Sequence, residues 1–69
     1  MPDRAVRCLV GDHRRDARLT QKALAELVGV SRQTIVSIEG GLTVPNVLTA
    51  IKIGRVLAVK VEALYPLAG

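Results

Sequence analysis

Arg32, Gln33 and Ser37 carry side chains of the types that bind the edges of nucleic-acid bases. A glutamine can bond adenine N6 and N7 together, and an arginine can bridge guanine O6 and N7 or hold a phosphate. Ser37 can donate or accept over a short distance, whereas Val36 can contact only a thymine methyl group. On a helix, positions 33, 36 and 37 point away from the apolar Ile35, which leaves them free to reach a DNA groove.

The stretch that must position these side chains is residues 20–39, TQKALAELVGVSRQTIVSIE. It predicts two short helices joined by a tight turn. Thr20 and Ser31 are suited to cap the two helices, because their hydroxyls can accept from free backbone N–H groups. Gly29 falls where the first helix ends and the chain turns, a position that favours glycine because it tolerates positive φ. The pattern is that of a helix-turn-helix whose second helix, about residues 31–40, can enter a major groove.

From Leu19 to Gly41 the chain reads L-T-Q-x-x-L-A-x-x-x-G-V-S-R-Q-T-I-x-x-I-E-x-G. This motif resembles the Cro/CI-type helix-turn-helix domains, also called the XRE family, and the resemblance runs from about Arg4 to Tyr65. It implies an all-α, lambda-repressor-like fold, a compact bundle of five short helices that forms a single domain over residues 1–69. It also implies a transcriptional regulator, expected to be a repressor, that binds double-stranded DNA sequence-specifically.

The resemblance assigns contacts to particular positions. Residues 32, 33, 36 and 37 would face the bases, and Gln21 resembles the family glutamine that fixes a helix N-terminus to a phosphate. Thr20, Ser31, Thr34 and Thr43 are further candidates for phosphate contacts. Because one such module touches few bases, we expect a homodimer reading two half-sites about 34 Å apart on a near-palindromic operator.

Arg14 and Glu39 form a candidate ion pair. On a helical wheel Arg14 flanks the apolar face of the first predicted helix, and Glu39 lies beside Ile35 on the inward face of the third. An inward carboxylate needs a partner, because an unpaired buried charge is costly. In the phage repressors that the sequence resembles, an arginine–glutamate pair at the matching positions joins these two helices. The resemblance implies the same role here; two independently solvated charges are the alternative.

Ahead of the motif, the pattern predicts a first helix from about Arg4 to Ala17, capped by Asp3. Gly11 would lie in mid-helix and cost roughly 1 kcal/mol relative to alanine. Cys8 is expected on the polar side as an exposed thiol. His13 falls within the apolar stripe, as a partly buried structural histidine or as a pH-sensitive position. The stripe itself is Val6, Leu9, Val10 and Ala17.

After the motif, Asn46 is expected to cap a fourth helix that runs to about Leu57. Ala58 occupies a helix-stop position where the resembled family usually has glycine, so we expect some backbone strain there. A short last helix is predicted over residues 61–64. The positions of the fourth helix expected to face the core are Val47, Ala50, Ile51, Gly54, Leu57 and Ala58.

Four apolar residues are predicted to lie on the surface around the fourth helix: Leu42, Val44, Leu48 and Val56. Self-association and ordinary scattered surface residues are both open explanations. The same surface is the basis of a rival function, an antitoxin-like or other protein-interaction module in which DNA binding is secondary.

Composition bounds the function further. The 69 residues carry a net charge of +4 with a pI near 10, which favours a polyanionic partner. Cys8 is the sole cysteine, which excludes an internal disulfide and fits a reducing cytoplasm. No apolar run approaches the ~20 residues of a membrane span. Cys8 and His13 project about 140° apart on a helix, so we expect no metal site, no cofactor and no enzymatic centre.

Overall fold

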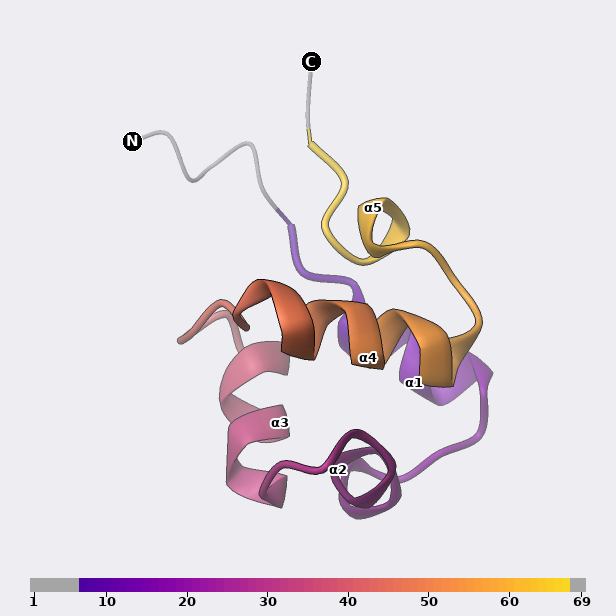
Figure 1. Ribbon diagram of the computed structural model, residues 1–69, viewed down its shortest axis with the longest axis vertical. Helices are drawn as coiled ribbons and strands as arrows, with labels where there is room; N and C mark the ends of the chain where they lie inside the picture. The colour runs from indigo at the N-terminus through magenta and orange to yellow at the C-terminus, as the bar shows by residue number, and fades with distance from the viewer. Residues whose placement is uncertain (1–6, 68–69) are drawn as a thin grey trace.

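The computed structural model describes residues 7–67, and the regular elements within that range are all helices (Figure 1). They are α1 (Val10–Asp16), α2 (Gln21–Val28), α3 (Arg32–Glu39), α4 (Val47–Leu57) and α5 (Val61–Leu64). The prediction of an all-α bundle of five short helices is confirmed. None of these helices is both long and apolar enough to cross a lipid bilayer.

Three helices begin at capping side chains, as predicted. Thr20, Ser31 and Asn46 each accept a hydrogen bond from the backbone N–H three residues later, at 2.9, 3.1 and 2.8 Å respectively. Such bonds satisfy donors that the first turn of a helix leaves free. Gly29 ends α2 with a φ of 89°, so the turn between α2 and α3 uses the left-handed conformation that glycine adopts without steric cost.

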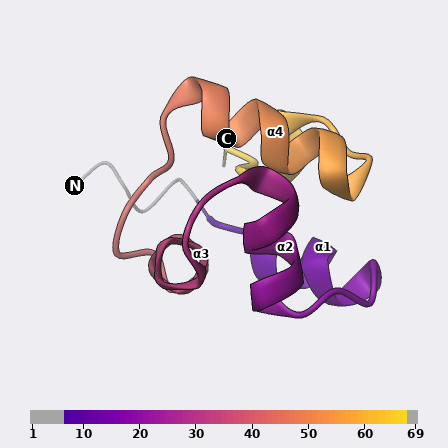
Figure 2. The same cartoon turned by 60° about the horizontal axis from the view of Figure 1, so that its bottom comes forward.

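The core is aliphatic and joins all five helices. α2 packs against α3 and α4, α1 packs against the same two helices, and α5 packs against α4. Figure 2 shows α3 almost along its axis, at one edge of the molecule. The fully buried large side chains are Val10, Leu24, Ile35, Ile38, Ile53 and Leu64.

The end of α4 has an unusual backbone. Ala58, its C-terminal capping residue, has a φ of 60° in the left-handed region. Side chains with a Cβ pay a steric cost there, so the strain predicted at this position is present. The chain then folds back on α4 so closely that a Cβ on Gly54 would lie 2.8 Å from the carbonyl oxygen of Val59.

The predicted first helix is wrong in extent. α1 begins at Val10 with Leu9 as its capping residue, so Gly11 lies in the first turn and not in mid-helix. Leu9 donates its backbone N–H to the carbonyl of Leu64 at 2.8 Å, which ties this segment to α5. Ala17 is exposed just past the helix end. The predicted cap Asp3 and the stripe residue Val6 lie outside the described residues.

Cys8 is not the exposed thiol that the sequence predicted. Because it precedes α1, the helical wheel does not apply to it, and its side chain packs against the core. Cys8 Sγ donates to the carbonyl oxygen of Ile38 at 3.3 Å and lies 3.6 Å from the Tyr65 hydroxyl. Burial, and then the adjacent Cys8 thiol, raise the pKa of Tyr65 above its usual value.

His13, predicted to be partly buried, is half-buried in α1.

The predicted faces of α4 also need correction. Val47, Ile51 and Ala58 were expected to face the core, but Val47 and Ile51 are 77% and 40% exposed and Ala58 is exposed as well. Ile53 takes the buried position instead, and Val56, expected on the surface, packs against the core. Both sides of α4 are apolar, so the sequence pattern did not distinguish the face that finds the core. The exposure predicted for Leu48 is confirmed.

Candidate nucleic-acid interface

The outer side of α3 carries the four positions expected to read bases. Arg32 and Gln33 are exposed in the first turn, and Val36 and Ser37 lie one turn further along, half-buried. Ile35, on the opposite side of the helix, is fully buried. The helix is therefore held from behind by the core while its N-terminal half presents a guanidinium and a carboxamide to solvent.

Ser37 is less accessible than its position on the wheel suggests. The loop after α3 turns back over the helix, and the backbone N–H groups of Leu42 and Thr43 donate to the Ser37 carbonyl at 2.9 and 3.4 Å. Thr43 itself is exposed in that loop. The structure thus brings Thr43 beside the C-terminal half of α3.

The hydroxyls at the start of α3 already have partners within the protein. Ser31 Oγ accepts from the backbone N–H of Thr34 and lies 2.9 Å from Thr34 Oγ1. Ser31 is exposed and Thr34 is half-buried. A hydroxyl has one donor and two acceptor lone pairs, so the pair can bind a further group without breaking the cap.

The structure brings Arg14 and Glu39 together as a bidentate ion pair. Arg14 Nε donates to Glu39 Oε2 at 2.7 Å, and Arg14 Nη2 donates to Oε1 at 3.2 Å. The side chains are only 12% and 10% exposed. Arg14 Nη1 also donates to the carbonyl oxygen of Leu19 at 2.8 Å, so the guanidinium joins α1, α3 and the connection to α2.

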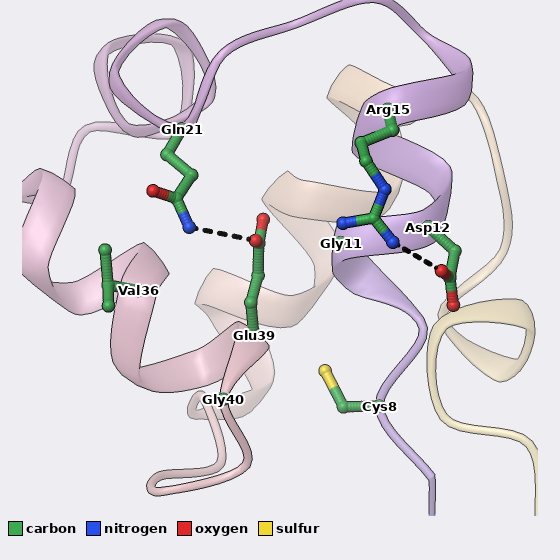
Figure 3. Close-up of a pocket in the computed structure, with 8 residues that line it drawn as sticks. All are labelled: Cys8, Gly11, Asp12, Arg15, Gln21, Val36, Glu39 and Gly40. Carbon is green, nitrogen blue, oxygen red and sulfur yellow. Dashed lines mark hydrogen bonds and ion pairs between the residues drawn. The ribbon is translucent and has the colours of Figure 1, made fainter.

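Gln21, expected at a phosphate, makes a contact that the sequence did not predict. Its Nε2 donates to Glu39 Oε1 at 3.1 Å, across the gap between α2 and α3 (Figure 3). Gln21 is half-buried at the first position of α2. A carboxamide carries a second N–H and an acceptor oxygen, so capacity for a further ligand remains.

An open hollow of about 450 Å³ lies beside this contact, lined by residues of α1, α2 and α3 together with Cys8 before α1 and Gly40 after α3 (Figure 3). Glu39 and Gly11 are neighbours in its wall, and a Cβ at position 11 would lie 3.2 Å from Glu39 Oε1. On its other side, Arg15 Nη2 pairs with Asp12 Oδ1 at 2.6 Å, and both side chains are more than half exposed. Within residues 7–67, no three His, Cys, Asp or Glu side chains gather as metal ligands would.

A second, apolar groove of about 330 Å³ runs between the start of α4 and α5. Its walls are Val44, Pro45, Val47, Ala50, Ile51, Val61 and Tyr65. Val44, Val47, Leu48 and Ile51, here called the α4 apolar surface, are all exposed, from 40% at Ile51 to 77% at Val44 and Val47. Compared with the predicted set, this surface gains Val47 and Ile51 and loses Val56, which packs against the core. Leu42 is 79% exposed, as predicted, but is not counted in this surface.

The chain is similar in sequence to known regulators. A family model described as "Helix-turn-helix" matches residues 12–64. An uncharacterized HTH-type transcriptional regulator of Methanothermobacter thermautotrophicus is 46% identical over 52 residues, which cover 75% of this chain and 75% of that protein.

Solved structures share the fold. The P22 c2 repressor in complex with a synthetic operator superposes with a TM-score of 0.77 at 27% identity, over 80% of this chain and 83% of the repressor chain. Hydroxypropylphosphonic acid epoxidase from S. wedmorenis gives a TM-score of 0.80 at 31% identity. That match covers 88% of this chain but only 32% of the epoxidase, so the likeness is confined to a third of the enzyme.

Proposed function

Because this chain belongs to the helix-turn-helix family of XRE-type, DNA-binding transcriptional regulators, we propose that it binds particular double-stranded DNA sequences and represses transcription. In this proposal α3 lies in the major groove. The observation that carries it is the orientation of α3, with Ile35 fully buried and Arg32 and Gln33 exposed on the other side.

Each base contact follows from the chemistry of its side chain. Gln33 bonds an adenine through N6 and N7, and Arg32 bridges a guanine or holds the adjacent phosphate. Val36 contacts a thymine methyl group, and Ser37 makes a short hydrogen bond at the edge of the interface. The half-burial of the last two gives Gln33 and Arg32 the larger share of base recognition.

Phosphates would be bound around this helix by backbone N–H groups and short side chains. Gln21 and the N-terminus of α2 hold one phosphate, since a helix N-terminus favours anions. Ser31, Thr34 and Thr43 contribute further hydrogen bonds from the start and end of α3. These contacts set the register of the protein on the duplex and add affinity without reading sequence.

A homodimer is the second part of the proposal. One module contacts few base pairs, so two copies related by a two-fold axis would read half-sites about 34 Å apart on a near-palindromic operator. The α4 apolar surface supports this assembly, because exposed apolar side chains clustered on so small a protein favour burial against a partner. The protein measures 32 × 21 × 20 Å, a size compatible with that spacing between two adjacent copies.

Selection of bound duplexes from a random pool, together with sedimentation analysis of the protein and its complex, tests this function. We expect enrichment of an inverted repeat, two protein chains per duplex, and an affinity that falls steeply with salt. Recovery of no preferred sequence would overturn the proposal.

An antitoxin-like interaction module is the second candidate, and the α4 apolar surface is the observation that favours it. That module would bind a partner protein with little dependence on salt, and DNA weakly. Enzymatic activity is not part of either proposal, because the family consists of DNA-binding regulators and the epoxidase likeness covers a minor part of that enzyme.

A further inference from the structure

Two side chains hold the Glu39 carboxylate. Arg14 donates to both of its oxygens and Gln21 Nε2 donates to Oε1 at 3.1 Å, while the missing side chain of Gly11 leaves room for α1 to lie close to it. The charge is balanced by Arg14, whereas the bond from Gln21 is the link that joins α2 directly to α3 at this point (Figure 3).

The position of this bond matters for the recognition helix. Glu39 is the last residue of α3 and Gln21 the first residue of α2, so the bond connects the far end of one motif helix with the near end of the other. The turn at Gly29 already joins their opposite ends. Two helices fixed at both ends have a defined crossing angle, and that angle sets the direction in which Arg32 and Gln33 point.

We propose that Gln21 is a positioning residue, whose carboxamide fixes the orientation of the recognition helix through its hydrogen bond to Glu39. This role is separate from the phosphate contact of Gln21 in the proposed function. The expectation that base recognition depends on the bond from Gln21 to Glu39 rests on the proposed DNA binding. Loss of a pure phosphate contact weakens binding to every sequence by the same factor. A misdirected recognition helix instead lowers the ratio of the affinity for the operator to the affinity for other sequences.

The first experiment needs no DNA. Gln21→Glu keeps the length of the side chain but replaces its N–H donors with a carboxyl beside Glu39. The introduced carboxyl would contact Glu39 Oε1 directly, whereas the Arg14 guanidinium is bonded to Glu39 and not to position 21. We therefore expect the repulsion from Glu39 to outweigh the attraction of Arg14 and to raise the pKa of the introduced carboxyl in the folded protein, so folding favours its protonated form. The variant's stability relative to the parent therefore recovers as the pH falls and is lost as the pH rises through that raised pKa.

Gln33→Glu is the matched control, because it makes the same chemical change in the first turn of the neighbouring helix, with the same favourable helix dipole. At pH 7 we expect the unfolding equilibrium constant of Gln21→Glu to exceed that of the control by roughly tenfold. By about pH 4, near the ordinary carboxyl pKa, the two variants should converge. Parallel stability–pH profiles for the two variants would overturn the proposal.

The second experiment measures sequence preference. Gln21→Met retains the shape of the side chain without its donors, and Lys22→Met removes a charge from the adjacent exposed position. Binding of both is measured to a selected inverted-repeat duplex and to a shuffled duplex of equal length. We expect Gln21→Met to lower the ratio of the two affinities by roughly tenfold, and Lys22→Met to weaken both equally. An unchanged ratio for Gln21→Met would overturn the positioning role.

The two experiments separate failure of this inference from failure of the proposed function. If the parent protein bound no DNA sequence specifically, the proposed function would be wrong. The stability–pH profiles would still decide whether Gln21 acts on Glu39.

Discussion

Gly11 and Glu39 face each other so closely that a Cβ at position 11 would lie 3.2 Å from Glu39 Oε1. An alanine within a helix is ordinarily about 1 kcal/mol more favourable than a glycine. Here the carboxylate cannot move aside freely, because Arg14 and Gln21 both hold it. We expect Gly11→Ala to lower the free energy of unfolding by roughly 1 kcal/mol, the cost of mild overpacking.

Chemical denaturation measures that change. Combined with Gln21→Ala, which frees one side of the carboxylate, Gly11→Ala should cost less than it does alone. A gain in stability from Gly11→Ala in the parent would show that position 11 has room for a methyl group.

The two neighbouring arginines of α1 should differ in their contribution to stability. Arg14→Ala leaves the largely buried Glu39 carboxylate, 10% exposed, without its counter-charge, and we expect a loss of about 3 kcal/mol. Arg15→Ala breaks only the solvent-exposed pair with Asp12, worth at most about 1 kcal/mol. Thermal unfolding of the two variants is the measurement, and equal melting temperatures would argue against a structural role for the Arg14–Glu39 pair.

Gln33→Ala should affect DNA binding and leave the fold intact. The side chain is exposed and its removal opens no cavity. We expect binding to weaken by about 1–3 kcal/mol, with relaxed base choice at one position in each half-site. Titration against a set of duplexes with single base-pair changes checks both effects. If affinity and base preference were unchanged, α3 would not be the recognition helix.

Ala58→Gly should stabilise the protein. The left-handed φ of 60° at this position costs a residue with a Cβ about 1 kcal/mol, and glycine avoids that cost. For a domain of this size the expected rise in melting temperature is about 4–8 °C. Ala17→Gly is the control, because Ala17 also follows a helix and is exposed but has an ordinary φ of −82°. A similar loss of stability in both variants would contradict the strain at Ala58.

Val47→Asp should separate self-association from folding. Val47 is 77% exposed within the α4 apolar surface, so a charge there disfavours a dimer and costs the monomer little. Leu27→Asp is a control on α2, where the leucine is 61% exposed but does not line the apolar groove. Sedimentation velocity should show dissociation for the first variant alone. A dimer that survives Val47→Asp would lie on another face.

Local signals made much of this fold predictable. The caps at Thr20, Ser31 and Asn46 and the turn at Gly29 depend on a few adjacent residues, so the sequence located the helices from Thr20 onward closely. The start of α1 was missed because an apolar pattern continued upstream through Leu9, where the chain instead bonds to α5.

Features that depend on distant packing were not accessible in the same way. The helical wheel of α4 has two apolar sides, and only the packed structure shows that Ile53 is buried while Val47 is exposed. The bond from Gln21 to Glu39 joins residues eighteen positions apart, and no periodic pattern in the sequence indicates that pairing. A signal did exist at Gly11, which precedes Arg14 by one helical turn and so shares the face that meets Glu39.

Tyr65 is the only aromatic residue of the chain, and its ring lines the apolar groove beside α4. With no tryptophan or phenylalanine present, ultraviolet emission from the whole protein comes from this one phenol. The protein therefore carries an intrinsic fluorophore at the place where a second copy is proposed to dock. Dissociation on dilution can therefore be followed by its intensity and anisotropy, without any attached dye.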